Sequence, residues 1–267
     1  MSAWRDQVVV VTGASLGIGE DVATTLAGHG ARLVLAARDE AGLQGVAGRC
    51  RQRGAAVEVV PCDITDELQC RSLVDRAAAR FGRIDTLICN AGQAMWARAE
   101  EVTDWSVFER LVRVNYLGAV YCTLAALPHL RASRGRLVAV SSLAGKTGVP
   151  MRTGYSAAKA ALNAFCDSLR IELVDSGVSV TVVCPGFVRT GSRARNLGSD
   201  GQALGRSPVS EDAMMLVAEC TRQLLDAAEH RDRELVMTAR ARLGMWLKLF
   251  APWFVDRMAS TAMARGR

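Results

Sequence analysis

A tyrosine and a lysine stand four residues apart in the stretch GYSAAKAALNAFCDSLRIEL, as Tyr155 and Lys159. At this spacing on a helix, the two side chains share one face. A phenol has an ordinary pKa of about 10, and a fixed ammonium beside it would favour the phenolate and lower that pKa. The pair could therefore act as a general acid and base, although taken alone it could also be a chance pairing on a solvated helix face.

A glycine-rich turn, TGASLGIG, occupies residues 12–19, between an expected strand and an expected helix. Glycines at such a place permit a tight turn and let the backbone approach a pyrophosphate, which then sits on the helix N-terminus. A purely structural turn is the alternative. The strand–turn–helix context favours a dinucleotide site.

Strand-like segments that are apolar throughout alternate with helical segments along the chain. The expected strands are residues 7–12, 32–37, 57–61, 84–89, 136–141, 178–184 and 234–237. The expected helices are residues 17–30, a segment ending at 53, and residues 66–81, 104–130, 155–174 and 211–228. Strands without a polar face are buried on both sides. The alternation predicts a doubly wound α/β fold of about seven parallel strands, with helices on both faces.

Composition excludes several classes of protein. The three histidines are scattered, and none of the eight cysteines forms a C-x-x-C pair, so no metal site is expected. Net charge is +6, but the residues from Arg231 onward carry eight basic and three acidic side chains, or +5, which leaves a nearly neutral body. We expect no nucleic-acid partner. Buried reduced thiols and a start that does not read as a signal peptide predict a cytoplasmic protein.

The motifs together resemble those of the short-chain dehydrogenase/reductase family over residues 7–237. The residues that carry the resemblance are the G-x-x-x-G-x-G turn, Asn90-Ala91-Gly92, Asn115, Ser142 thirteen residues before Tyr155, and Pro185-Gly186 with Thr190. The family often has an asparagine where this chain has Cys89. We expect the Cys89 side chain to point into the core without loss of cofactor binding.

The resemblance implies a role for each matched residue. Tyr155 would exchange a proton with the substrate oxygen, and Lys159 would lower the pKa of Tyr155 and hydrogen-bond the nicotinamide ribose. Ser142, rather than its neighbour Ser141, would orient the substrate oxygen. Asn115 would hold a water linking Lys159 to solvent. The residues expected to bind the cofactor are Gly13, Ser15, Leu16, Gly17, Ile18, Gly19, Arg38, Asp63, Ile64, Asn90, Ala91, Gly92, Tyr155, Lys159, Pro185, Gly186, Val188 and Thr190.

The end of the second strand, LVLAARDE, bears on the choice of cofactor. An acidic side chain there would accept hydrogen bonds from the ribose of NAD, but Ala37 occupies the position and Arg38 follows. A guanidinium can pair with the 2′-phosphate of NADP. We therefore expect NADP, with NAD as the alternative, since Asp39 could weaken the preference and Arg38 could be an ordinary solvated charge.

The expected function is hydride transfer between NADP(H) and an alcohol or carbonyl substrate. A non-catalytic dinucleotide-binding regulator is the alternative, and the complete set of Asn115, Ser142, Tyr155 and Lys159 argues against it. A hydrophobic substrate is expected from the apolar residues that flank the motifs, which are Met95, Trp96, Val149, Met151 and Phe187.

The chain is expected to form one Rossmann-fold domain over residues 1–238, followed by a basic, aromatic-rich extension over residues 239–267. Residues 189–210 would form a substrate loop. A disordered insertion without a role is the alternative. The resemblance also implies a homodimer or homotetramer that packs through helices 104–130 and 155–174. The extension could pack on the partner subunit, cap the cleft, or lie on a membrane surface.

Overall fold

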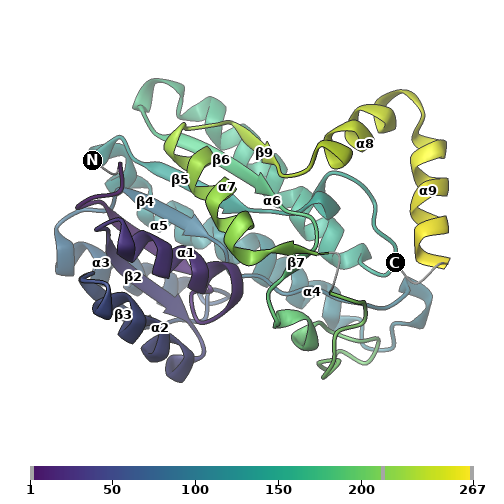
Figure 1. Ribbon diagram of the computed structural model, residues 1–267, viewed down its shortest axis with the longest axis horizontal. Helices are drawn as coiled ribbons and strands as arrows, with labels where there is room; N and C mark the ends of the chain where they lie inside the picture. The colour runs from purple at the N-terminus through teal and green to yellow at the C-terminus, as the bar shows by residue number, and fades with distance from the viewer. Residues whose placement is uncertain (1–2, 212–213, 265–267) are drawn as a thin grey trace.

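A seven-stranded parallel sheet forms the centre of the protein, with the strand order β3-β2-β1-β4-β5-β6-β9 (Figure 1). The structure is a computed structural model, and it describes residues 3–211 and 214–264. Its strands are β1 (Val8–Thr12), β2 (Arg32–Ala37), β3 (Val57–Pro61), β4 (Thr86–Cys89), β5 (Arg136–Val140), β6 (Ser179–Cys184) and β9 (Glu234–Val236). Two short strands, β7 (Val188–Arg189) and β8 (Met215–Leu216), pair separately. The predicted fold class is confirmed.

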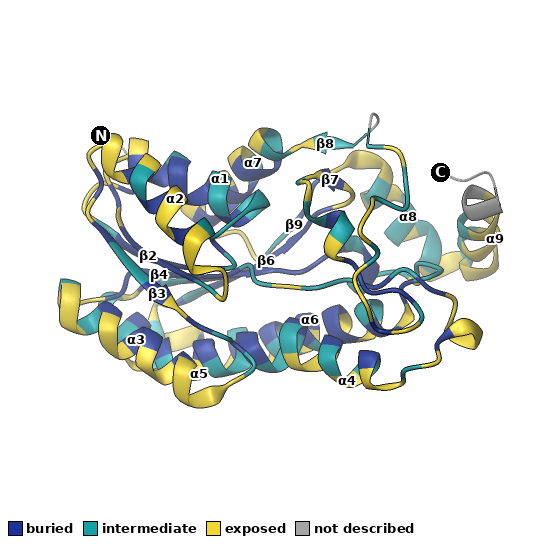
Figure 2. Ribbon diagram, turned by 90° about the horizontal axis from the view of Figure 1, so that it is seen from below, coloured by how far each residue is buried: buried dark blue, intermediate teal, exposed yellow. Residues whose placement is uncertain are grey.

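Helices cover both faces of the sheet (Figure 2). One layer holds α1 (Gly17–Gly28), α2 (Glu40–Gln52) and α7 (Val217–Glu229); the other holds α3 (Glu67–Phe81), α4 (Ser106–Val112), α5 (Gly118–Ser133) and α6 (Thr153–Glu172). Each layer has its own core: along β1, Val10 packs in the cluster on the α3 and α5 side, and Val9 and Val11 pack in the opposite cluster. This two-sided burial is why the strands are apolar throughout.

The expected helix over residues 104–130 contains a local irregularity. Between α4 and α5, residues Arg113–Leu117 form a π-helical turn, η2. The Asn115 side chain lies in this turn, and its Nδ2 atom donates to the Leu111 carbonyl at 3.0 Å. The Asn115 side chain thus occupies a main-chain carbonyl within the helix, and the helix is wider at this point. The expected long helix is thus present over Ser106–Ser133, with a π-turn at a candidate site residue that the sequence did not predict.

Other boundaries differ less. β2 and β3 begin and end where the sequence predicts, but α7 begins at Val217, six residues later than expected, because β8 precedes it. The expected substrate loop contains a 3-10 turn, η5 (Ser192–Arg195), and Leu197 forms isolated bridges with Met95 and Ala203. Residues 212 and 213 of the expected helix lie outside the described part of the chain.

One helical stretch, Ser106–Ser133, is long and apolar enough to cross a membrane by length and composition. In the structure it comprises α4, η2 and α5 and covers the sheet, with Cys122, Ala126 and Leu130 in the core. It is thus placed as a core helix of the α/β architecture.

The C-terminal extension forms two helices, α8 (Ala239–Phe250) and α9 (Pro252–Ala264), which lie at one end of the molecule (Figure 1). Ala241 and Met245 pack against the core, and Lys248 Nζ donates to the Lys146 carbonyl at 3.1 Å. Most of the bulky side chains remain exposed, namely Leu243, Trp246, Leu249, Phe250, Trp253, Phe254 and Met258. In the described part of the chain, the contacts that anchor the extension come from one face of α8.

All eight cysteines are buried free thiols, as expected. Burial raises the pKa of the Cys50 thiol to about 11 and those of Cys89, Cys166, Cys184 and Cys220 to about 12. The side chain of Cys89 points under α5, where its sulfur lies 3.9 Å from the Ala119 carbonyl oxygen. The predicted inward orientation of Cys89 is confirmed.

Candidate active site

A cavity of about 380 Å³ opens at the carboxyl edge of the sheet, where loops follow β1, β2, β4, β5 and β6. This is where doubly wound sheets bind ligands. Every expected catalytic or cofactor-binding residue lines this cavity except Gly19 and Asn115, which lie directly behind its wall. Residues spread over 178 positions of the sequence are thereby brought to one site, from Gly13 to Thr190.

The glycine-rich turn after β1 has the conformation that a phosphate cradle needs. Gly13 and Gly17 have φ angles of 64° and 61°, in the left-handed region. A Cβ atom on Gly19 would stand 2.3 Å from the Gly13 carbonyl oxygen. No side chain caps α1, so the N–H groups of its first turn are available to an anion. The residues present therefore fit the pyrophosphate of a dinucleotide.

Asn90 and Thr12 fix this turn against the end of β4. The Asn90 side chain donates to the carbonyls of Thr12 and Gly13, at 3.0 and 3.2 Å. In return, the main-chain N–H groups of Asn90 and Ala91 donate to the Thr12 hydroxyl at 3.0 and 3.1 Å. Thr12 was not among the expected site residues. A threonine that ends a strand immediately before the glycine turn was the available signal.

Two arginines face the far end of this half of the cavity. Arg38 is exposed and lies 3.9 Å from Asp63, and Arg195 reaches from η5 to within 3.9 Å of Asp39. Asp39 also accepts a hydrogen bond from the Gly42 N–H at 3.0 Å as the N-cap of α2. The Asp39 carboxylate thus has two local partners, which reduces its repulsion of a further anion.

The expected acid/base pair projects from the first turns of α6. Lys159 is only 3% exposed; its Nζ donates to the Val140 carbonyl at 2.8 Å and lies 5.9 Å from the centroid of the Tyr155 ring. Ser142 follows β5, accepts a hydrogen bond from the Ala144 N–H at 3.2 Å, and lies near enough to Tyr155 for its hydroxyl to lower the pKa of the phenol. Ser141 instead donates to the Lys159 carbonyl at 3.4 Å. Of the two serines, Ser142 is the one whose hydroxyl acts on the Tyr155 pKa.

The electrostatics of the pair differ from the expectation. Burial raises the pKa of Tyr155, and the groups that act against this rise are the Ser142 hydroxyl and the guanidinium groups of Arg152 and Arg193. Burial lowers the pKa of Lys159 to about 8. The cations that oppose this rise are the two arginines, while Lys159 donates to the Val140 carbonyl; a lowering of the Tyr155 pKa by Lys159 stays a prediction.

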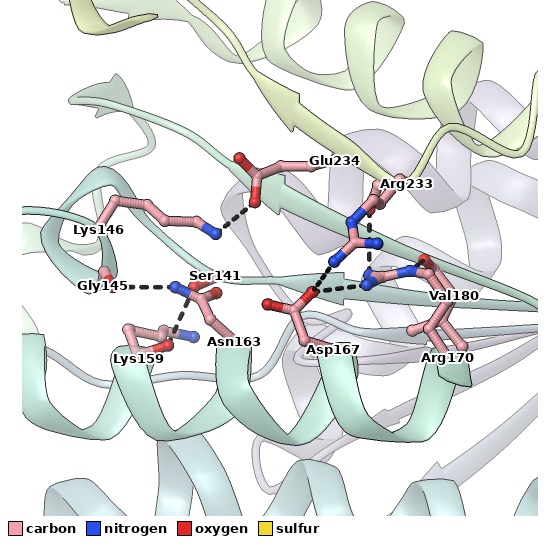
Figure 3. A network of polar contacts seen from close by, with 10 residues as sticks. All are labelled: Ser141, Gly145, Lys146, Lys159, Asn163, Asp167, Arg170, Val180, Arg233 and Glu234. Carbon is pink, nitrogen blue, oxygen red and sulfur yellow. Dashed lines mark hydrogen bonds and ion pairs between the residues drawn. The ribbon is translucent and has the colours of Figure 1, made fainter. Parts of the chain in front are cut away.

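A set of polar contacts fixes α6 relative to the sheet (Figure 3). Asn163 donates to the Gly145 carbonyl at 3.0 Å, just after Ser142. Near the other end of α6, Arg170 donates to the Val180 carbonyl of β6 at 2.9 Å and pairs with Asp167. Lys146, which follows the Ser142 turn, pairs with Glu234 of β9. The contacts of Asn163 and Arg170 hold the helix that carries Tyr155 against the Ser142 turn and β6, and the Lys146–Glu234 pair holds that turn against β9.

Asn115 lies behind the cavity wall and is 1% exposed. Its side chain donates to the Gln93 carbonyl at 2.7 Å and accepts from the Gln93 N–H at 3.2 Å. A Cβ atom on Gly92 would come within 2.9 Å of Asn115 Oδ1 and 3.6 Å of Lys159 Nζ. Asn115 therefore positions the loop after β4 next to Lys159.

Comparison with known proteins shows which family shares this chain's sequence. The profile of the short chain dehydrogenase family matches residues 7–199. The chain belongs to this family. Similarity to individual relatives extends beyond residue 199, over nearly the whole chain.

Several relatives show the extent of the similarity. The chain is 39% identical over 252 residues to 11-beta-hydroxysteroid dehydrogenase A of Sesamum indicum, covering 92% of this chain and 72% of the relative. It is 30% identical over 261 residues to dehydrogenase/reductase SDR family protein 7-like of Dictyostelium discoideum, covering 96% and 81%. An alcohol dehydrogenase of the archaeon Thermococcus sibiricus, solved with 5-hydroxy-NADP, superposes with a TM-score of 0.75 at 28% identity, covering 86% of this chain and 95% of that structure. This short chain dehydrogenase is an NAD(P)-dependent oxidoreductase that interconverts alcohols and carbonyl compounds.

The substrate end of this dehydrogenase contains residues that the sequence analysis missed. Of the five apolar residues expected to line the cleft, Phe187 alone is among the described residues of the cavity wall; Met95 is fully buried in a separate cluster. Arg152 and Arg193 occupy the wall instead. Arg152 stands three residues before Tyr155, at a position that can be recognised from the sequence only once the course of the chain before α6 is known.

Proposed function

We propose that this protein transfers a hydride between NADP(H) and the hydroxyl or carbonyl carbon of a bulky, largely hydrophobic substrate, with Tyr155 as the general acid and base. The observation that carries the proposal is the convergence of Ser142, Tyr155 and Lys159 in one cavity with the glycine turn. A steroid-like skeleton is supported by the similarity to proteins named 11-beta-hydroxysteroid dehydrogenase.

In this proposal, the nicotinamide of the bound cofactor supplies or accepts the hydride. Tyr155 donates its phenolic proton to the substrate oxygen during reduction and takes it back during oxidation. The Ser142 hydroxyl, on the same cavity wall as Tyr155, orients the same oxygen. Lys159 is held by the Val140 carbonyl at the side of the Tyr155 ring, where it can also meet the ribose. Arg152 and Arg193 stabilise the phenolate when the proton is away.

Preference for NADP is supported by the charges after β2. Arg38 is exposed on the cavity wall, and Arg195 of η5 adds a second guanidinium near Asp39. Arg38 lies 3.9 Å from Asp63 and Arg195 lies 3.9 Å from Asp39, and two guanidinium groups at this end of the cavity favour a phosphate over a hydroxyl. The relative solved with 5-hydroxy-NADP is consistent with the same choice.

The test is oxidation of NADPH and of NADH in the presence of a panel of neutral ketones, including 3-, 11- and 17-keto steroids. Turnover with NADPH, at a higher kcat/KM than with NADH, supports the proposal. Tight NADPH binding without turnover of any carbonyl compound would instead support the non-catalytic regulator that the sequence left as the alternative.

We also propose a cytoplasmic homodimer or homotetramer. Leu124, Ile171 and Val174 are exposed on or next to α5 and α6, the helices expected to meet their copies across a two-fold axis. The buried free thiols support a reducing compartment. Light scattering at micromolar concentration checks the assembly, and a monomer mass of 28.6 kDa would contradict it.

A further inference from the structure

Two buried arginines line the cavity beside Tyr155. Arg152 directly precedes α6, and Arg193 lies in η5 of the substrate loop; each is 7% exposed. Both guanidinium groups stand over the ring of Phe187, at 4.8 Å from its centroid. Two like charges thus share a site from which most water is excluded.

Arg152 has ring neighbours but no anionic partner among the described residues. Its Cζ lies 5.2 Å from the centroid of Trp96 and 5.6 Å from that of Tyr155. Aromatic faces attract the cation, but they provide no strong hydrogen-bond acceptor for the five N–H groups of the guanidinium. The Nε atom of Arg152 is buried without a hydrogen-bond partner in the described part of the chain, and the side chain does not cap α6.

Arg193 is only partly compensated. Its Nη2 donates to the Val188 carbonyl at 3.3 Å, and its Nε lies 3.8 Å from Glu211, beyond hydrogen-bond distance. Among the described residues, one distant carboxylate therefore serves the two buried cations. A buried charge without a close counter-ion is costly to keep, which points to a ligand that supplies the missing anion.

The backbone before Arg152 supports a functional reason for its placement. Met151 has a φ of 65°, in the left-handed region that a bulky side chain rarely adopts. Strained residues of this kind persist where the surrounding structure requires a particular geometry, and they cluster at ligand sites. The strained residue is the one that leads the chain into Arg152 and α6.

We propose that Arg152, assisted by Arg193, binds a carboxylate of the substrate, so that the preferred substrates are oxo acids and hydroxy acids rather than neutral ketones and alcohols. Because Arg152 Cζ stands 5.6 Å from the Tyr155 ring centroid, the carboxylate lies only a few bonds from the carbonyl that Tyr155 protonates. This inference rests on the proposed function, narrows its substrate class, and adds a polar anchor to a site that we had expected to be apolar.

The anion that these arginines bind could instead be a phosphate of the cofactor. The glycine turn and the uncapped end of α1 already provide for the pyrophosphate, and Arg38 with Arg195 stands at the adenosine end. Arg152 contacts Trp96 and Phe187, which lie outside those features. The placement favours the substrate, and measurement of NADPH affinity separates the two sources.

The experiment compares 4-oxo-4-phenylbutanoate with its methyl ester, which has the same ketone without the charge. Wild-type protein should reduce the acid with a kcat/KM at least about 10-fold above that of the ester, within the range of a charge-assisted hydrogen bond. Arg152→Met should lower the acid-to-ester ratio by about 10- to 100-fold, Arg152→Lys should lower it less, and Arg193→Met should have an intermediate effect. The exposed control Arg71→Met should leave the ratio unchanged.

Calorimetric titration of both compounds into the wild-type protein with NADP⁺ needs no variant and no turnover. The acid should bind, and the ester should bind at least about 10-fold more weakly. Equal binding, or no binding of the acid, overturns the proposal. A rise in the NADPH Kd of Arg152→Met that matches the loss of acid turnover assigns the arginine to the cofactor and overturns it equally. Reduction of neutral ketones with NADPH would still uphold the proposed function, so the two failures are distinguishable.

Discussion

The two ends of the cavity are constructed differently. The dinucleotide end consists mainly of main-chain groups: the glycine turn, the first turn of α1, and the loop after β4 braced by Asn90. The substrate end consists of side chains, with the buried guanidinium groups of Arg152 and Arg193 around Phe187. A ligand common to a whole family can be bound by main-chain groups, whose arrangement depends on the spacing of glycines. A ligand particular to one protein is met by side chains from loops that are distant in sequence.

Tyr155→Phe should have the largest effect, because it should nearly abolish turnover at the substrate end while leaving cofactor binding at the dinucleotide end intact. Loss of the phenolic hydroxyl removes proton transfer to the substrate and should reduce kcat by about 10²- to 10⁴-fold, the usual contribution of a general acid. The glycine turn is untouched, so the NADPH Kd measured by fluorescence titration should remain within about twofold. The matched control Tyr121→Phe removes a hydroxyl on α5, away from the cavity wall. A Tyr155→Phe rate close to the wild-type rate would remove Tyr155 from the mechanism.

Lys159 lies where the dinucleotide end and the substrate end of the cavity meet, and Lys159→Met tests its depressed pKa through the free energy of unfolding. The folded-state pKa of about 8 lies below the ordinary 10.5, so the buried cation destabilises the fold fully below pH 8. As pH rises from 8 towards 10.5, the folded state releases its proton first, and this destabilisation fades. Wild-type stability should therefore rise relative to Lys159→Met over that window, by up to roughly 3 kcal/mol. Urea unfolding of both proteins at pH 7 and pH 9.5 measures it, and a constant difference between them would refute the depressed pKa.

Arg38→Asp should alter the dinucleotide end alone. A carboxylate there repels a 2′-phosphate and accepts hydrogen bonds from a ribose, so the NADPH-to-NADH ratio of kcat/KM should fall by about 10- to 100-fold. Arg195→Met should lower the same ratio by only a few-fold, because Arg195 is paired with Asp39. Calorimetry showing that NADH binds the native protein more tightly than NADPH would show that the charge argument is wrong.

The C-terminal extension belongs to neither end, and its effect should be the smallest. The described residues that line the cavity end at Asn196, so α8 and α9 do not cap it within this chain. Packing on a partner subunit and contact with a membrane remain as explanations of their exposed rings. The second is supported by the basic residues Arg240, Arg242, Lys248 and Arg257 among them. Flotation with anionic liposomes should recover full-length protein but not a chain ending at Thr238. Absence of both from the lipid fraction at low salt would leave the packing role.

The sequence predicted those parts of the molecule that local pattern determines. β2 and β3 were placed to the residue because apolar runs between turns specify buried strands, and the glycine turn and the Tyr155–Lys159 spacing located the cavity. The π-turn at Asn115 was missed because helical periodicity does not show which carbonyl a side chain will take. Arg152 was missed because its burial depends on Trp96 and Phe187, whose proximity only the folded chain creates.

The eight buried thiols described above give the molecule a chemical reporter of its own integrity. A thiol reagent attacks the thiolate, and here the native state hides every sulfur and raises the pKa of most of them. Labelling at neutral pH should therefore be confined to molecules whose core has opened. The amount of dye incorporated by a preparation would count its unfolded fraction, even for variants such as Tyr155→Phe that have no catalytic signal left to follow.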